Sequence, residues 1–104
     1  MSGQIGRDKD MKIVEGTEAQ IVQAFDNLKL ILEFAGATME DIVDLTTFHT
    51  DMRDLSTFMR VKDRYLVRNF PAWTAIGAAS LGGVSGLIIE IKAVAVLSAT
   101  KIKS

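Results

Sequence analysis

Four side chains between residues 49 and 92 carry groups that can do chemistry: His49, Trp73, Glu90 and Lys92. Glu90 and Lys92 are two residues apart, so in a β-strand they lie on one face and offer an acid beside an amine. A charged pair among apolar residues requires water, partners or an interface. We therefore expect the chemistry of this protein near the strand face that carries Glu90 and Lys92.

Each of these residues has a functional and a structural interpretation. Lys92 can act as a nucleophile or bind an anion, or it can pair with Glu90 or with an acid of a neighbouring subunit. Trp73 can stack on a ring-bearing ligand or pack in a subunit interface. His49 can be a general base or a hydrogen-bonded structural residue. The candidate catalytic residues are thus Lys92, His49 and Glu90, and the alternatives stay open.

The composition excludes several kinds of site. The sequence has 104 residues, a net charge of −1, one histidine and no cysteine. Disulfides, thiolate catalysis and cysteine-based zinc sites are excluded, and we expect neither a metal nor a cofactor. The charge balance argues against nucleic acid and anionic membranes as partners. The sequence has no apolar run of about 18 residues and no signal-peptide layout, which predicts a cytoplasmic protein.

Two apolar runs must position the candidate side chains. Residues 69–77 and 87–95 flank a glycine-rich stretch, Gly82–Gly86. This pattern predicts two strands that pair with one another through a flexible connection. In the second run Glu90 and Lys92 alternate with apolar residues, so one face of the strand is expected to meet helices. These apolar residues are Ile89, Ile91, Ala93 and Ala95.

Two helices are predicted earlier in the chain. Thr17 and Gln20 have the spacing of a capping box, and Gly36 is placed to end the helix that they begin. The buried stripe of this helix is expected to contain Ile21, Phe25, Leu28, Leu32 and Ala35. A second helix is expected to begin with Asp54 as its N-cap. Its inner stripe is Leu55, Phe58, Val61 or Lys62, and Tyr65, while Arg60, Arg64 and Arg68 face solvent.

A further strand is predicted at Ile42–Thr50, between the two helices. The order of elements then predicts an α/β (α+β) fold in which two helices cover one face of a sheet. The other face has no helix to cover it. Its apolar content, in a chain that is 48% hydrophobic, favours contact with another subunit.

Short segments along most of the chain match, in order, the motifs of a known family. They are Ser2-Gly3-Gln4-Ile5, Gln23–Leu28, Ala35–Thr38 with Asp41–Val43, Thr50–Met52, Phe70–Ala72 and Ile89–Ala95. In these segments the chain resembles the RidA (YjgF-like) family of reactive-intermediate deaminases, which also carries the label endoribonuclease L-PSP.

The resemblance implies a chorismate-mutase-like fold and a homotrimer with small-molecule pockets at the subunit boundaries. Members with the full motif hydrolyse enamines and imines, with an arginine that holds the substrate carboxylate and a glutamate on the last strand that handles water or a proton. Ser2 and Gly3 resemble the segment whose backbone amides line the pocket. Members carry two strands before this segment, so the resemblance implies a single domain, 1–104, without those first two strands.

The sequence departs from the family at four positions: Lys62 stands at a usual asparagine, Ala75 stands at a common cysteine, and the other two are Trp73 and Lys92. Trp73 stands where members have the arginine of "PAR", and Lys92 stands where they have the second glutamate of "EIEA". Indole carries no positive charge, so standard imine deaminase activity is not expected. Four segments resemble an arginine-lacking branch of the family: Phe48–Asp51, Val61-Lys62, Trp73–Ala75 and Glu90–Lys92.

We therefore expect a small homotrimeric protein that binds a carboxylate or carbonyl metabolite in pockets between its subunits. The expected ligand-binding residues are Trp73, Lys92, Glu90, His49, Ser2 and Gly3. Two alternatives remain: a binding or assembly protein without chemistry, and an enamine/imine deaminase that works without the arginine.

Overall fold

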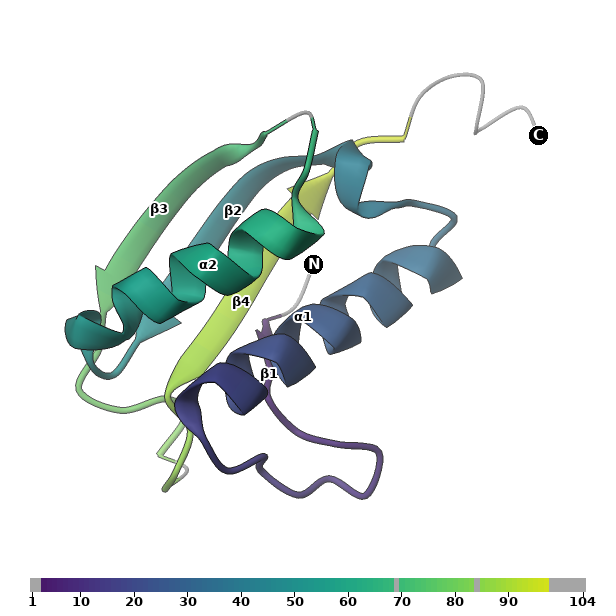
Figure 1. Cartoon of the computed structure of the whole chain (residues 1–104). Coiled ribbons are helices and arrows are strands. Elements are labelled where there is room, and N and C mark those ends of the chain that lie inside the picture. The colour runs from purple at the N-terminus through teal and green to yellow at the C-terminus, as the bar shows by residue number, and fades with distance from the viewer. Residues whose placement is uncertain (1–2, 69, 84, 98–104) are drawn as a thin grey trace.

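The computed structural model describes residues 3–68, 70–83 and 85–97 (Figure 1). The helices are α1 (Thr17–Phe34) and α2 (Leu55–Tyr65), and the strands are β1 (Gln4–Ile5), β2 (Ile42–His49), β3 (Ala72–Gly77) and β4 (Ile89–Ala95). Short 3-10 turns at Met39–Asp41 and Met52–Asp54 precede β2 and α2. Both predicted helices and the predicted strand between them are confirmed.

The strands form one four-stranded sheet in the order β1-β4-β2-β3. Strand β4 is antiparallel to both of its neighbours, whereas β2 and β3 are parallel. The prediction that the last two strands pair with one another is therefore wrong, because β2 lies between them. Parallel neighbours need a crossover connection, and α2 supplies it between β2 and β3.

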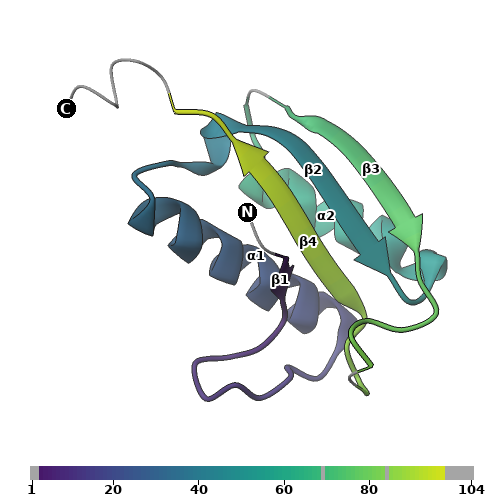
Figure 2. The same cartoon turned by 180° about the vertical axis from the view of Figure 1, so that it is seen from behind.

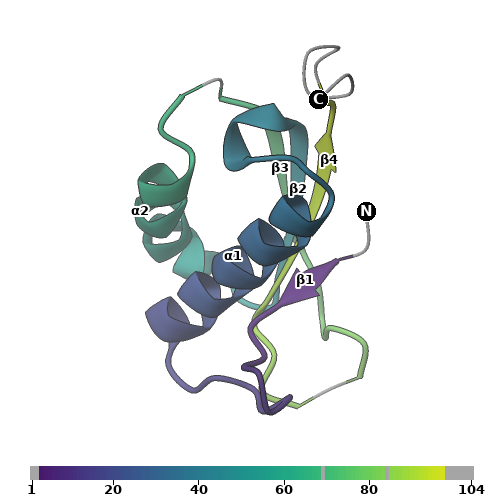
Figure 3. The same ribbon diagram turned by 90° about the vertical axis from the view of Figure 1, so that its right-hand side faces the viewer.

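Both helices cover one face of the sheet, and no helix of the described residues lies on the opposite face (Figures 2 and 3). Because side chains alternate along a strand, β4 buries Ile89, Ile91 and Ala93 against the helices. The predicted layer of two helices on one side of a sheet is confirmed. We call the other side the helix-free face, and it is formed by Asp44, Thr46, Phe48, Thr74, Ile76, Glu90, Lys92 and Val94.

The buried stripe of α1 agrees with its predicted spacing except at the last position. Ile21, Phe25, Leu28 and Leu32 are buried, whereas Ala35 is the exposed C-cap of the helix. Gly36 follows with a φ of 80°, as predicted for a helix end. The amide of Ala37 then donates to the Leu32 carbonyl at 2.8 Å, and that of Gly36 to the Glu33 carbonyl at 3.1 Å.

The predicted capping box at the start of α1 is wrong. Gly16 is the N-cap, and no side chain caps the helix there. Gln20 is only 2% exposed, and its amide turns toward two loops instead of the helix end. Its Nε2 donates to the carbonyls of Val14 and Gly86, at 3.1 and 2.9 Å, and its Oε1 accepts from the Ile88 amide at 2.8 Å. Gln20 thus ties the N-terminal loop to the entrance of β4.

Helix α2 begins after Asp54, as predicted, but the Asp54 side chain makes no capping bond. Asp51 caps the preceding turn instead, accepting from the Arg53 amide at 2.9 Å. Phe58 and Val61 form the buried stripe. The predicted row of solvent-facing arginines is confirmed: Arg60 and Arg64 pair with Glu18 of α1, and Arg68 pairs with Glu40.

Candidate functional site

The four candidate side chains lie on two opposite sides of the sheet. Glu90 and Lys92 share the helix-free face, as their spacing on β4 predicts. Trp73 and His49 lie on the helix-covered face, where both rings contact Phe58 of α2. A single chain therefore does not bring all four together.

Glu90 and Gly3 are brought into direct contact. A Cβ atom on Gly3 would lie 2.3 Å from Glu90 Oε2 and 2.7 Å from its carboxylate carbon. Glycine therefore leaves room for the carboxylate beside the backbone of the β1 segment, and a larger residue would displace the Glu90 side chain. Across the ladder, Glu90 is opposite Phe48. Ser2, the neighbour of Gly3 in the predicted site, lies outside the described residues.

Lys92 is exposed and lies opposite Thr46 of β2. Within the described ranges Lys92 forms no ion pair with Glu90. The structural alternative in which Lys92 pairs with Glu90 is therefore not observed in a single chain. Apolar side chains on the same face are also open to solvent, with Val94 50% and Ile76 41% exposed. The helix-free face thus offers a carboxylate and an amine beside uncovered apolar surface.

On the covered side, five residues form what we call the Trp73 cluster: Thr47, His49, Phe58, Lys62 and Trp73. Trp73 Nε1 donates to Thr47 Oγ1 at 3.0 Å, and Thr47 Oγ1 lies 2.7 Å from His49 Nε2. The Thr47 hydroxyl thus links the two rings, and whether it donates to or accepts from His49 Nε2 depends on the tautomer of the imidazole.

His49 is 1% exposed and makes an edge contact with Phe58, with ring centroids 5.0 Å apart. Burial lowers the pKa of His49 from its ordinary value of 6.5, against a smaller opposing effect from the charge of Asp54. In one chain His49 is thus a neutral, hydrogen-bonded residue without access to solvent.

This burial predicts a pH dependence of stability. Because the folded state lowers the pKa of His49, the unfolded state binds more protons at acidic pH, and the free energy of unfolding falls as the pH drops below about 6.5. The loss levels off below the folded-state pKa. Urea unfolding of the protein and of His49→Gln between pH 5 and 8 measures the effect. An equal slope in both proteins would contradict the assignment to His49.

Phe58 and Lys62 were not singled out as site residues by the sequence pattern. Phe58 stacks on Trp73 with centroids 5.5 Å apart and an interplanar angle of 26°, and Lys62 Nζ lies 4.9 Å from the Trp73 ring centroid. Both contacts form because the crossover connection between β2 and β3 places α2 against β3. One signal was readable: Thr47 and His49 are two residues apart on a strand and so point to the same side.

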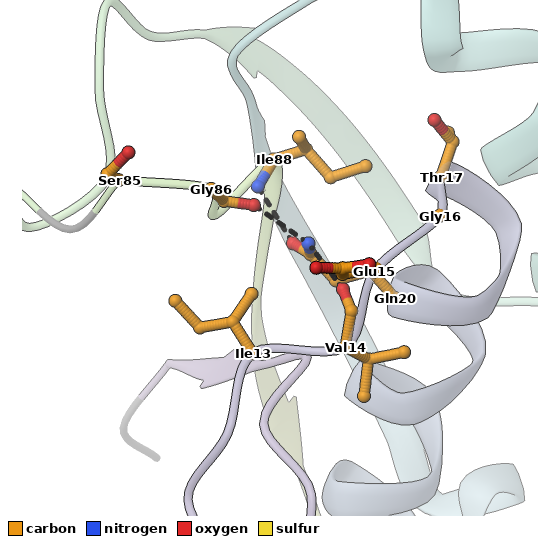
Figure 4. Close-up of a pocket in the computed structure, with 9 residues that line it drawn as sticks. All are labelled: Ile13, Val14, Glu15, Gly16, Thr17, Gln20, Ser85, Gly86 and Ile88. Carbon is orange, nitrogen blue, oxygen red and sulfur yellow. Dashed lines mark hydrogen bonds between the residues drawn. The ribbon is translucent and has the colours of Figure 1, made fainter.

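Two cavities lie away from the four candidate residues. The larger, of about 410 Å³, opens beside the amide of Gln20 (Figure 4) and is lined by Ile13, Val14, Glu15, Gly16, Thr17, Gln20, Ser85, Gly86 and Ile88. The smaller, of about 280 Å³, lies between β1 and α1 and reaches Gly3. The side-chain amide of Gln20 already makes its hydrogen bonds to the two loops. We therefore assign the larger cavity a structural role.

Two kinds of feature are absent from the described part of the chain. None of its helices has the length and apolar character that crossing a membrane requires. Its histidine, aspartate and glutamate side chains form no cluster of three or more that is arranged to hold a metal ion.

Comparison with known proteins gives a consistent result. A family model described as endoribonuclease L-PSP matches residues 1–97. The RutC family protein YjgH of Escherichia coli is 38% identical over 97 residues, which are 91% of this chain and 72% of that protein. The human protein named 2-iminobutanoate/2-iminopropanoate deaminase is 37% identical over 98 residues, which are 92% of this chain and 70% of that protein.

Solved structures agree with these matches. RidA from an Antarctic Psychrobacter species superposes with a TM-score of 0.88 at 34% identity, covering 93% of this chain and 78% of that one. Yeast Mmf1 superposes with a TM-score of 0.87 at 31% identity, covering 93% and 77%.

Proposed function

The chain belongs to the RidA/YjgF family, whose model is described as endoribonuclease L-PSP, and from this premise we propose that it binds a small carboxylate or carbonyl metabolite in a pocket between the subunits of a homotrimer. Glu90 and Gly3 of one subunit form one wall of this pocket. The Trp73 edge of a neighbouring subunit forms the other.

The contact between Glu90 and Gly3 is the observation that carries the proposal. A carboxylate pressed against glycine backbone on an open sheet face has no structural partner among the described residues. A half-buried carboxylate there can orient water or a polar ligand. The bordering apolar side chains, Val94 and Ile76, suit a face that another subunit covers.

The separation of the candidate residues supports a shared pocket. Trp73 lies on β3, the edge strand of the sheet, whereas Glu90 lies on the central strand β4 and faces the other way. No rearrangement of side chains within one chain joins them across the sheet. Two copies can do so when the β3 edge of one packs beside the helix-free face of the next.

Val94→Asp is expected to prevent assembly. Val94 is 50% exposed in one chain, and burying an unpaired aspartate in an interface costs several kcal/mol. We expect a trimeric mass for the unaltered protein and a monomeric mass for the variant in sedimentation equilibrium. Met59→Asp is the matched control, since Met59 is 44% exposed on the helix side. Equal masses for all three proteins would contradict the proposed interface.

Ligand binding is tested on the same proteins. Calorimetric titration with pyruvate and 2-oxobutanoate is expected to show one saturable site per subunit, and the assembly-deficient variant is expected to lose it. Binding that survives in monomers would place the pocket within one chain. Intact trimers that bind neither acid would favour an assembly protein without chemistry.

Imine hydrolysis is a second candidate function. The position of Glu90 favours it, and two relatives that are 37% and 35% identical are named 2-iminobutanoate/2-iminopropanoate deaminase. Ammonia release from an amino-acid-derived imine tests this candidate. If Glu90 is the acid–base group, Glu90→Gln lowers the rate by roughly 10²–10⁴-fold. The absence of turnover in the unaltered trimer would leave binding as the function.

A further inference from the structure

The proposed pocket needs a cation to hold a carboxylate, and α2 brings one to the side chain of Trp73. We propose that Lys62 is the anion-binding residue of the Trp73 cluster and that it selects small carboxylates with an apolar or aromatic body. This inference rests on the proposed function, because it names the residue that recognises the ligand of the same pocket.

Lys62 is the most shielded of the cations that form ion pairs in the described residues. Its side chain is 15% exposed, against 55% for Arg64 and 62% for Arg60 on the same helix. Its Nζ lies 4.9 Å from the Trp73 ring centroid, within the distance at which an ammonium is attracted to an indole. A charge that is partly removed from water interacts more strongly with an incoming carboxylate than an exposed one does.

The ring beneath this ammonium is held in place from two directions. The Trp73 N–H donates to Thr47 at 3.0 Å, and Phe58 stacks on the indole at 5.5 Å. A ring fixed in this way loses little conformational freedom when a ligand binds. Trp73 is half-buried, so part of the indole stays open to the apolar portion of a ligand.

The ion pair that Lys62 makes within the chain is easily replaced. Asp63 Oδ1 lies 3.3 Å from Lys62 Nζ, but the Asp63 side chain is 69% exposed, and exposed pairs contribute little. Arg60 and Arg64 are already engaged by Glu18. Lys92 lies on the helix-free face, on the opposite side of the sheet from the Trp73 ring.

The chemistry of lysine determines which ligands this arrangement favours. An ammonium is a point charge and cannot form two parallel hydrogen bonds to a carboxylate, as a guanidinium does. Part of the affinity must therefore come from apolar contact with the indole. We expect phenylpyruvate to bind about tenfold more tightly than pyruvate.

The single tryptophan of the chain gives a direct test, because its indole N–H produces one cross-peak in a ¹H–¹⁵N correlation spectrum. The trimer is titrated with pyruvate and phenylpyruvate for the unaltered protein, Lys62→Met, Lys62→Arg, Lys92→Met and Lys29→Met. Lys62→Met is expected to weaken binding of both acids by about tenfold or more. Lys62→Arg keeps the affinity within about threefold, and the exposed Lys29→Met control leaves it unchanged.

The outcomes separate this inference from the proposed function. If Lys62→Met binds both acids as the unaltered protein does, Lys62 is not the anion-binding residue, while the proposed function stands. If Lys92→Met loses the affinity instead, the cation lies on the helix-free face and the inference is overturned. If the unaltered trimer binds neither acid, the proposed function fails and this inference fails with it.

Discussion

Phe58→Ala is expected to destabilise the protein by about 3–5 kcal/mol, the range for removing a buried aromatic side chain. Phe58 is fully buried and joins the two layers of the fold. Its ring lies 5.5 Å from that of Phe25 on α1, 5.0 Å from that of His49 on β2 and 5.5 Å from that of Trp73 on β3. One substitution therefore removes contacts to a helix and to two strands.

Urea unfolding followed by circular dichroism measures this loss. Phe34→Ala is the matched control, because Phe34 is 86% exposed and its truncation is expected to change stability by less than about 0.5 kcal/mol. Similar losses in both variants would show that Phe58 does not hold the layers together. Because Phe58 also supports the Trp73 ring, ligand affinity should fall in any Phe58→Ala protein that stays folded.

Gln20→Leu is expected to lower the free energy of unfolding by about 3 kcal/mol, although leucine has nearly the same volume as glutamine. The Gln20 side chain makes three hydrogen bonds while 2% exposed, to the carbonyls of Val14 and Gly86 and from the amide of Ile88. Each buried group left without a partner costs about 1–3 kcal/mol, and water in the adjacent cavity offsets part of that cost.

Hydrogen exchange locates the effect of this substitution. The Ile88 amide is expected to lose protection in Gln20→Leu, while amides in the centre of α1 keep theirs until global unfolding. Gln23→Leu is the control, since the one hydrogen bond of the Gln23 side chain within the described residues is to the Asn27 side chain on the same helix, at 2.9 Å. A protected Ile88 amide in Gln20→Leu would contradict the proposed tie between the two loops.

The fold was predictable where the physics is local. The repeat Ile21, Phe25, Leu28 and Leu32 and the positive φ of Gly36 belong to one helix and can be read from consecutive residues. The pairing of β3 with β2 could not be predicted from the sequence, because the crossover helix α2 determines where the strand that follows it joins the sheet. The same holds for Gln20, whose partners Gly86 and Ile88 lie more than sixty residues away.

The candidate site was predictable to the same extent. The alternation of β4 correctly placed Glu90 and Lys92 on one face. The resemblance put Gly3 and Glu90 in one pocket without predicting that they touch, and their contact is a finding of the structure. The sequence did not predict that Trp73 faces away from them, because the face of an edge strand is set by its register with β2. The sequence pattern named Lys62 as a possible member of the inner stripe of α2 but not as a site residue, since helical spacing alone does not show which ring lies beneath it.

The central position of β4 has a consequence for biosynthesis. Every other strand of the described sheet precedes β4 in the chain, yet both β1 and β2 pair with it. A nascent polypeptide leaving the ribosome therefore displays β1 apart from the β2–α2–β3 unit, with the inner edge of β2 unpaired, until residues 89–95 emerge. Completion of the sheet waits until residues 89–95 have been synthesised, and during that interval the nascent chain is open to chaperones or to misassembly.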